Sequence, residues 1–344
     1  MSYDPLARRQ LGRTPLRVTQ LGLGTAPLGG FRGVIPEDEA VGTIRTAYDA
    51  GLRLFDTAPY YGYGRAELRV GEALRLLPRE SFVLSTKVGR WMSPWRPGDA
   101  REGLRAGGLD FKPTYDLSHD GVMRSIEQSH CRLGIASIDI LLIHDVDVFT
   151  HGSGQAADQR YREAIEGAYP ALDELRRQGV IKAVGVGLNN IEPCIRFAAD
   201  TDIDCILLAG RYTLLEQGAL DELLPLCERK SIGIMLGGPF NSGILVTGPV
   251  DGAKYDYRDA PPVVLERARR LDEVCRRHDI AMATVALQFP LAHRAVASVI
   301  PGAMSRAEVL ENVERMRAPI PAGLWAELRN EGLLHEAAPV PPAG

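Results

Sequence analysis

Short apolar runs alternate with longer amphipathic stretches along most of the chain. The apolar runs are rich in Val, Ile and Leu, as in SFVLSTKVG (81–89) and SIDILLIHDVD (137–147). The stretches that follow them repeat their apolar residues at helical spacing, as in HDGVMRSIEQSHCRLG (119–134). A strand followed by a helix, many times over, is the pattern of βα units around a parallel sheet.

Roughly eight such pairs can be followed through the sequence, which is the number found in a closed (β/α)₈ barrel. Strands are predicted at 18–29, 52–58, 81–89, 137–147, 180–187, 203–210, 232–240 and 295–302. Helices are predicted at 37–51, 65–77, 119–134, 191–200, 219–231, 264–279, 281–294 and 305–317, with another that ends in LDELRRQG (172–179). We therefore expect a TIM barrel that makes residues 1–344 a single domain, with a core at about 10–320.

A doubly wound open sheet is the alternative fold. It would normally carry GxGxxG between its first strand and helix, whereas LGLGTAPLGG spaces its glycines differently. Two irregular insertions, 90–118 and 246–262, interrupt the alternation. Long loops in a compact domain often form lids or substrate walls, although surplus surface loop is the simpler interpretation.

Composition restricts the classes of function. Hydrophobic residues make up 45% of the 344 residues and charged residues 24%, as in ordinary globular proteins. The net charge of −4, with both signs interspersed, disfavours binding to nucleic acids or anionic membranes. Neither a membrane-spanning run nor a secretory leader is evident, so we expect a soluble, cytoplasmic protein. The five cysteines are scattered without CxxC spacing, which predicts reduced thiols and no metal site.

Three polar residues end consecutive predicted strands. Asp56, Lys87 and His144 each follow an apolar run, and in a parallel barrel such ends meet at the rim that carries the chemistry. Tyr61 lies in the loop just after Asp56. Each residue alone has an ordinary interpretation, as a turn aspartate, a lysine that reaches solvent or a hydrogen-bonded histidine. Their occurrence together at one rim favours a catalytic group.

These four side chains suit proton transfer at a carbonyl or hydroxyl group. A tyrosine hydroxyl ordinarily has a pKa near ~10, and a neighbouring ammonium such as Lys87 lowers it by stabilising the phenolate. Asp56 is expected to pair with Lys87, and His144 to donate a hydrogen bond to the substrate oxygen. If the reaction is a reduction or oxidation, a hydride carrier is also needed.

The chain resembles the aldo-keto reductase superfamily over about residues 10–320. The motifs that carry the resemblance are LGLGTAPLG, GLRLFDTAPYYGYGRAE, STKVG, IDILLIHDVD, PFNSGIL and VIPGAMSRAEVLEN, all in the family's order. The resemblance implies a barrel that binds NAD(P), with Tyr61 as proton donor or acceptor. Asp56, Lys87 and His144 match the other members of the family's tetrad.

The resemblance also implies a set of cofactor-binding residues. They are Gly24, Thr25, Asp56 and Asn189 near the nicotinamide; Pro239, Phe240, Asn241, Ser242 and Gly243 around the pyrophosphate; and Gly302, Ser305, Arg306, Glu311 and Asn312 at the adenosine end. The sequence departs from the family pattern at Gly237, where an aromatic ring is common, at Ala209, where Gln is usual, and in GLNN around Asn189. In members selective for NADP, cations meet the 2′-phosphate, but here Gly302 stands where a Lys is common and Glu308 where an Arg is common. This favours NAD because a carboxylate repels the phosphate; compensation by Arg306 and a preference for NADP are the alternative.

Within the superfamily, GGPFNSGIL, AGRYTLLEQ and GVGLN are most similar to a bacterial branch. It contains L-fucose or D-threo-aldose 1-dehydrogenases and pyridoxal 4-dehydrogenase, which implies oxidation of a cyclic hemiacetal to a lactone. Arg65, Trp91 and Trp95 are candidates for the substrate wall, with loop packing as the alternative for the tryptophans.

Other functions remain open at this point. A pyridoxal 4-dehydrogenase or a general aldehyde reductase is the second hypothesis within the enzymes. A cofactor-sensing subunit would retain the same tetrad, and a non-redox barrel enzyme would bind no nicotinamide. The expected partner is a small sugar or aldehyde, and the sequence leaves the oligomeric state undetermined.

Overall fold

Eight parallel strands form the central sheet of the computed structural model, which describes residues 3–30, 33–99 and 107–341. The strands are β3 (Leu23–Gly24), β4 (Leu54–Asp56), β5 (Val83–Val88), β8 (Ile140–His144), β9 (Ala183–Leu188), β10 (Cys205–Ala209), β11 (Gly233–Gly237) and β14 (Val296–Ile300). Each pairs in parallel with the next in this order. Parallel bridges from Leu21 to Val299 and from Gly24 to Gly302 join the two edges. The predicted (β/α)₈ barrel is confirmed.

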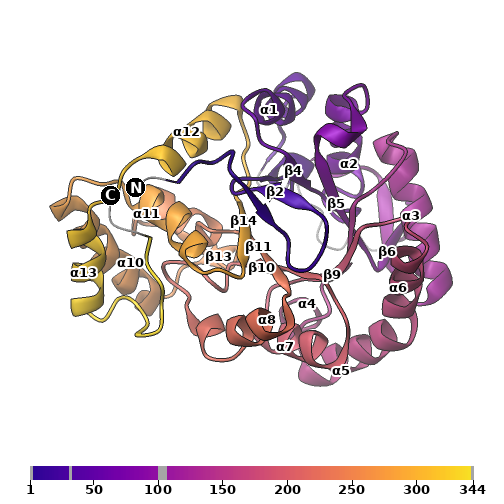
Figure 1. Cartoon of the computed structure of the whole chain (residues 1–344). Helices are drawn as coiled ribbons and strands as arrows, with labels where there is room; N and C mark the ends of the chain where they lie inside the picture. The colour runs from indigo at the N-terminus through magenta and orange to yellow at the C-terminus, as the bar shows by residue number, and fades with distance from the viewer. Residues whose placement is uncertain (1–2, 31–32, 100–106, 342–344) are drawn as a thin grey trace.

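Helices surround the strands on all sides (Figure 1). They are α1 (Glu37–Asp49), α2 (Arg65–Leu74), α3 (His119–Leu133), α4 (Val148–His151), α5 (Gly154–Glu163), α6 (Tyr169–Arg177), α7 (Ile191–Asp200), α8 (Leu223–Lys230), α9 (Ile244–Thr247), α10 (Pro262–Arg277), α11 (Met282–Gln288), α12 (Arg306–Arg317) and α13 (Ala322–Asn330). The helix α13 was not predicted. Its buried Leu324, Trp325 and Leu328 pack on the outside of the barrel.

The barrel has two apolar layers. The larger one lies between the strands and the helices, and the smaller one fills the barrel interior with residues such as Leu54, Ile140, Leu142 and Met235. Alternate residues of a strand point to opposite sides, so each strand supplies both layers. This explains why the strands read as nearly continuous apolar runs.

The predicted first strand, 18–29, is wrong as a single element. Its beginning belongs to β2 (Arg17–Thr19), which pairs with β1 (Arg8–Gln10) in an antiparallel hairpin, and only β3 joins the barrel. The hairpin's Leu11, Leu16 and Val18 join the interior apolar layer. They cover the apolar end of the barrel opposite the rim, a role that periodicity alone does not reveal.

The two insertions contain β-structure of their own. Residues 90–118 include the antiparallel pair β6 (Arg90–Pro94) and β7 (Phe111–Tyr115), while 100–106 lie outside the described residues. Residues 246–262 include the short hairpin of β12 (Lys254–Tyr255) and β13 (Arg258–Asp259). Its turn residues Asp256 and Tyr257 have φ values of 47° and 64°.

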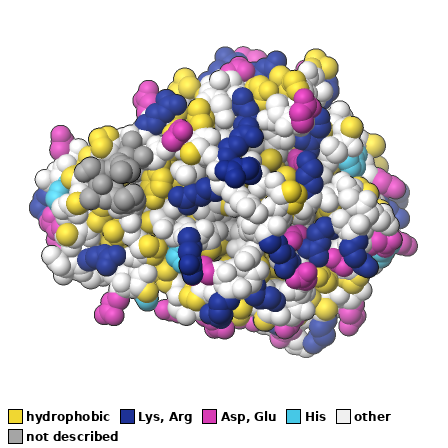
Figure 2. Space-filling model, viewed as in Figure 1, with side chains coloured by type: hydrophobic (Ala, Val, Ile, Leu, Met, Phe, Trp, Pro, Cys, Tyr) yellow, Lys and Arg dark blue, Asp and Glu magenta, His cyan; other side chains and the backbone are white. Residues whose placement is uncertain are grey.

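The surface mixes both signs of charge. On the face shown in Figure 2, Lys and Arg side chains lie between Asp and Glu side chains. Several are paired, as Arg13 is with Asp202 and Asp204. Within the part of the chain that the structure describes, no helix is long and apolar enough to cross a membrane.

Candidate active site

Strand alternation brings the predicted catalytic side chains to the inside of the barrel rim. Leu54 and Leu142 point into the barrel, so Asp56 and His144, each two residues further along the same strand, also point inward. On β5, Lys87 lies two residues after Ser85 and so on the same face as Ser85. The facing strands β9, β10 and β11 carry small residues at this level. A Cβ atom on Gly187 would lie 3.3 Å from Lys87 Cε, so the glycine leaves room for the extended lysine.

Asp56 and Lys87 form a buried ion pair. Lys87 Nζ donates to Asp56 Oδ2 at 2.7 Å and to the Thr57 carbonyl at 2.7 Å, and the Ser85 hydroxyl donates to Asp56 Oδ1 at 2.9 Å. The Lys87 side chain is 1% exposed and the Asp56 side chain is 4% exposed. Burial raises the pKa of the Asp56 carboxyl, and the Lys87 charge together with the hydrogen bonds opposes this shift. The pair fixes the ammonium against the tyrosine ring.

Tyr61 lies between the ammonium and the imidazole. Lys87 Nζ is 4.9 Å from the centroid of the Tyr61 ring, and the His144 ring meets that ring edge to face at 5.8 Å. The loop that carries Tyr61 is closely packed, because a Cβ atom on Gly29 would lie 2.5 Å from the Tyr61 carbonyl carbon. The structure therefore brings the three strand-end residues Asp56, Lys87 and His144 together with the loop residue Tyr61, and their catalytic role stays a prediction.

The surroundings of His144 favour its neutral form. Burial, and then the charges of Arg90 and Lys87, place the pKa of this imidazole well below its usual range. A neutral imidazole has one N–H donor, which suits it to bind a substrate oxygen rather than to supply a formal positive charge.

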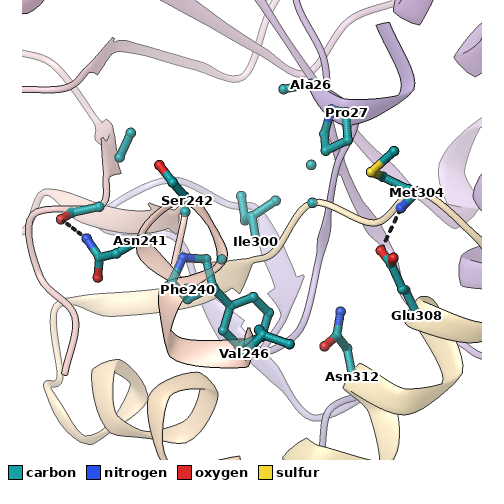
Figure 3. Close-up of a pocket in the computed structure, with 18 of the residues that line it drawn as sticks. Ala26, Pro27, Phe240, Asn241, Ser242, Val246, Ile300, Met304, Glu308 and Asn312 are labelled. Carbon is teal, nitrogen blue, oxygen red and sulfur yellow. Dashed lines mark hydrogen bonds between the residues drawn. The ribbon is translucent and has the colours of Figure 1, made fainter. Parts of the chain in front are cut away.

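An elongated cavity of about 510 Å³ begins at Asp56 and Tyr61. Figure 3 shows part of its lining, with Phe240, Asn241, Ser242 and Val246 on one side and Met304, Glu308 and Asn312 on another. The cavity thus extends from the tetrad to the first turns of α12. Of the expected cofactor residues, those that line it are Gly24, Asp56, Asn189, Pro239, Phe240, Asn241, Ser242, Gly243, Gly302, Glu311 and Asn312.

The loop after β11 is shaped to approach a ligand with its backbone. Gly238, Asn241, Ser242 and Gly243 all have positive φ values, from 44° to 105°. The Asn241 side chain fixes this shape, since its amide donates to the Gly210 carbonyl at 3.0 Å and its oxygen accepts from Thr213 at 2.5 Å. A tight, small-residue loop of this kind fits the pyrophosphate of a dinucleotide.

Three expected cofactor residues lie outside the cavity lining. Thr25 is fully buried and its hydroxyl donates to the Asp56 carbonyl at 2.9 Å. Ser305 caps α12 by accepting from the Glu308 amide at 3.2 Å. Arg306 turns toward α1, where its amide donates to Glu39 at 2.9 Å and its guanidinium to the Asp38 carbonyl at 2.8 Å. Thr25 and Ser305 support the lining residues through their hydrogen bonds.

The three expected substrate residues also lie outside this cavity lining. Trp91 donates to Asp116 at 3.2 Å and stacks under Arg124 at 4.7 Å, so it packs on the α3 side of the β6–β7 hairpin. Trp95 donates to the Asp99 carbonyl at 3.3 Å, and Arg65 begins α2. Their role as a substrate wall stays a prediction.

Other lining residues were not named from the sequence. They are chiefly Ala26, Pro27, Val246, Thr247, Asp256, Tyr257, Met304 and Arg315. Half of these eight residues come from the 246–262 insertion, whose length is typical of a lid or a substrate wall. In the described ranges, no group of three or more His, Cys, Asp or Glu residues is arranged to hold a metal ion.

A family model described as the Aldo/keto reductase family matches residues 20–330. This match covers the barrel, the tetrad and the cavity together. The chain belongs to the aldo/keto reductase family. It is accordingly an NAD(P)-dependent oxidoreductase, and its loop at 238–243 and the start of α12 are the parts that fit the cofactor.

Several curated dehydrogenases are similar to this chain over nearly its whole length. The chain is 41% identical to pyridoxal 4-dehydrogenase of Microbacterium luteolum, over 95% of this chain and 98% of that protein. It is 38% identical to D-threo-aldose 1-dehydrogenase of a Pseudomonas species, over 93% and 95%. Among solved structures, the holo form of aldo-keto reductase AKR11C1 from Bacillus halodurans matches with a TM-score of 0.74 and 26% identity, over 97% and 98%.

Proposed function

We propose that this enzyme oxidises the carbinol of a cyclic hemiacetal sugar to a lactone, with NAD⁺ as the preferred hydride acceptor. The observation that carries the proposal is the Tyr61, Lys87 and His144 cluster at the head of the dinucleotide-shaped cavity. The similarity to D-threo-aldose 1-dehydrogenase supports the sugar as substrate. The whole chain acting as one cytoplasmic domain is part of the same proposal.

The tetrad residues have distinct tasks in this reaction. A nicotinamide cofactor held by the loop at 238–243 and the start of α12 would supply the hydride acceptor for this oxidation. Tyr61 accepts the proton of the carbinol hydroxyl, and Lys87 stabilises the phenolate that this requires. The N–H of neutral His144 donates a hydrogen bond to the same oxygen and orients it. Asp56 holds Lys87 in place through the 2.7 Å ion pair.

Pyridoxal is a second candidate substrate. It too forms an internal cyclic hemiacetal, so the same proton transfer serves both substrates. The 41% identity to pyridoxal 4-dehydrogenase is the observation that favours it. A general aldehyde reductase would run the reaction in the opposite direction with the same residues.

A substrate screen tests the proposal. L-fucose, D-arabinose, L-galactose and pyridoxal are each mixed with the enzyme and NAD⁺, and NADH is followed by its absorbance. We expect a sugar to give the highest kcat/KM, with a lactone as product. A higher value for pyridoxal would select the second candidate.

Two other results would contradict an oxidoreductase of this kind. Tight NADH binding without turnover of any hemiacetal or aldehyde would indicate a cofactor-sensing subunit. Absence of NADH binding in a fluorescence titration would indicate a non-redox barrel.

The preference for NAD is predicted to depend on Glu308. Its carboxylate lines the cavity and accepts from the Met304 amide at 2.8 Å, which holds the negative charge at the adenosine end. Arg306 pairs with α1 instead. We expect Glu308→Gln to raise kcat/KM for NADP about tenfold with little change for NAD, because a carboxylate repels the 2′-phosphate.

The matched control for this experiment is Glu314→Gln. Glu314 is an exposed residue of α12 outside the cavity lining. The substitution Glu314→Gln removes one negative charge from the same helix, so it should leave the ratio of kcat/KM for NADP to kcat/KM for NAD unchanged. A wild-type enzyme that prefers NADP would overturn the inference.

A further inference from the structure

A buried arginine lies beside His144, and the proton chemistry described above does not use it. Arg90 is the first residue of β6 and is 7% exposed. Gly89, with φ of 105°, turns the chain out of the barrel strand β5 and so places Arg90 next to the rim. The backbone carbonyl of Arg90 accepts a hydrogen bond from the Ser125 hydroxyl at 2.8 Å, which anchors this turn to α3.

The guanidinium of Arg90 is held on all sides. Its Nη1 atom lies 2.9 Å from Asp145 Oδ2 and 3.4 Å from His144 Nδ1. Its carbon Cζ lies 4.3 Å from the centroid of the Tyr60 ring and 4.8 Å from that of Tyr115. Stacking between two aromatic rings fixes the plane of a guanidinium, which a lysine cannot reproduce.

The partners of Arg90 are themselves fixed. The Tyr115 hydroxyl donates to the carbonyls of His144 and Asp145, at 3.0 and 3.2 Å. Asp145 has φ of 55°, and its Oδ1 accepts from the Asn189 amide at 3.2 Å. Because Asn189 lines the cavity, the Arg90–Asp145 pair connects the imidazole with the cofactor end of the site.

This arrangement determines which nitrogen of His144 carries the proton. A guanidinium has donors and no acceptor, so the ring nitrogen that faces it must present its lone pair. Nδ1 of His144 faces Arg90, which leaves the proton of the neutral ring on Nε2.

The groups that face His144 favour the neutral ring. They are Arg90 from β6, Lys87 from β5, Tyr61 from the loop after β4, Tyr115 from β7 and Asp145 on its own segment. Asp145 Oδ1 lies 3.4 Å from Nε2, but the charge of this carboxylate is balanced by Arg90. Burial contributes most to the low pKa of the imidazole, followed by the charge of Arg90 and then that of Lys87.

We propose that Arg90 is a positioning residue that keeps His144 neutral with its proton on Nε2, the form that donates a hydrogen bond to the substrate oxygen. The hydrogen bond to the substrate oxygen rests on the proposed function, whereas the protonation state of His144 does not. Tyr60, whose ring covers the guanidinium, acts in the same assembly.

Long-range ¹H–¹⁵N NMR of the histidine rings tests the proposal on the wild-type enzyme without substrate. His144 is assigned by comparison with a His144→Gln sample. We expect an Nε2–H neutral ring that does not titrate between about pH 5.5 and 8, where an unperturbed histidine has its pKa. An Nδ1–H ring, or a normal titration, would overturn the proposal.

Variants of Arg90 separate positioning from mere structural support. In Arg90→Gln the His144 signal should begin to titrate, with its midpoint at least about one pH unit higher than in the wild type. A matching loss of kcat on the acidic side should appear at the same pH. Arg90→Lys keeps the charge, so it should preserve the neutral ring, but the lost stacking should lower kcat.

A control and a rescue variant complete the experiment. Arg124→Gln removes an arginine that stacks on Trp91 in the same insertion, and it should leave the His144 signal unchanged. If Arg90→Gln does not fold because Asp145 loses its partner, Arg90→Met with Asp145→Asn removes both charges, and because no donor then faces Nδ1, the neutral ring should lose its preference for the Nε2–H form. An unshifted His144 in folded Arg90→Gln, or a ring that stays wholly Nε2–H in the double variant, contradicts the proposal, even if the substrate assays succeed.

Discussion

Tyr61→Phe is expected to lower kcat by about a thousandfold and to leave NADH affinity unchanged. General acid–base catalysis by one positioned group contributes roughly 10²–10⁴ to a rate, and the phenol oxygen is the atom that carries the proton in the proposed mechanism. The substitution keeps the ring, so the 4.9 Å contact with Lys87 and the edge-to-face contact with His144 persist. Stopped-flow turnover and a fluorescence titration with NADH measure the two quantities.

Tyr63→Phe is the matched control for this loss. Tyr63 is a buried residue of the same loop, and its ring packs against Tyr60 at 5.9 Å. Removal of its hydroxyl should change kcat by no more than about threefold, because it carries no proton of the reaction. A Tyr61→Phe enzyme with wild-type kcat would require another acid or base and would sink the proposed mechanism.

Lys87→Met is expected to cost about 3–5 kcal/mol of unfolding free energy and to abolish turnover. The change leaves the Asp56 carboxylate, 4% exposed, without its cationic partner, and breaking a buried pair has a cost of this size. Urea denaturation measures the stability. Asp56→Asn with Lys87→Met removes both charges and should recover most of the stability while turnover stays lost, because the phenolate still lacks its ammonium.

The pH dependence of this variant has a definite sign. Burial already raises the pKa of Asp56 in the wild type, and loss of Lys87 raises it further. A carboxyl whose folded-state pKa exceeds its unfolded value of about 3.9 stabilises the fold below that value and loses this contribution as pH rises through the folded-state pKa. The deficit of Lys87→Met relative to the wild type should therefore shrink as the pH falls toward 4. A deficit that grows on acidification would contradict the ion-pair interpretation.

The barrel and the tetrad positions follow from local patterns. The alternation of buried strands and amphipathic helices is written in the sequence, and the strand ends of parallel βα units meet at one rim. Asp56, Lys87 and His144 are each located by this rule. The expected strand at 18–29 failed because a short hairpin and a barrel strand share one apolar run, and only the closure of the sheet separates them.

The contacts made by side chains outside the eight barrel strands depended on the tertiary structure. Trp91 and Arg90 are neighbours at the start of one hairpin, yet Trp91 stacks under Arg124 while Arg90 reaches His144. Consecutive residues of a strand point to opposite faces, and the packing of the β6–β7 hairpin between α3 and the rim decides which partner each face meets.

The sequence by itself determined the fold, the family resemblance and the place of Asp56, Lys87 and His144 at the rim, because strand periodicity places strand-end residues whatever the loops do. Tyr61, in the loop after Asp56, was identified by its nearness to that strand end and by the family motif. Only the tertiary structure decided that Arg306 turns to α1 while Glu308 faces the cavity, and that Tyr60 stacks on Arg90, which faces the His144 imidazole. The reason is physical. A long charged side chain pairs with an opposite charge or an acceptor that another element brings close in space, and that partner often lies far away in the sequence.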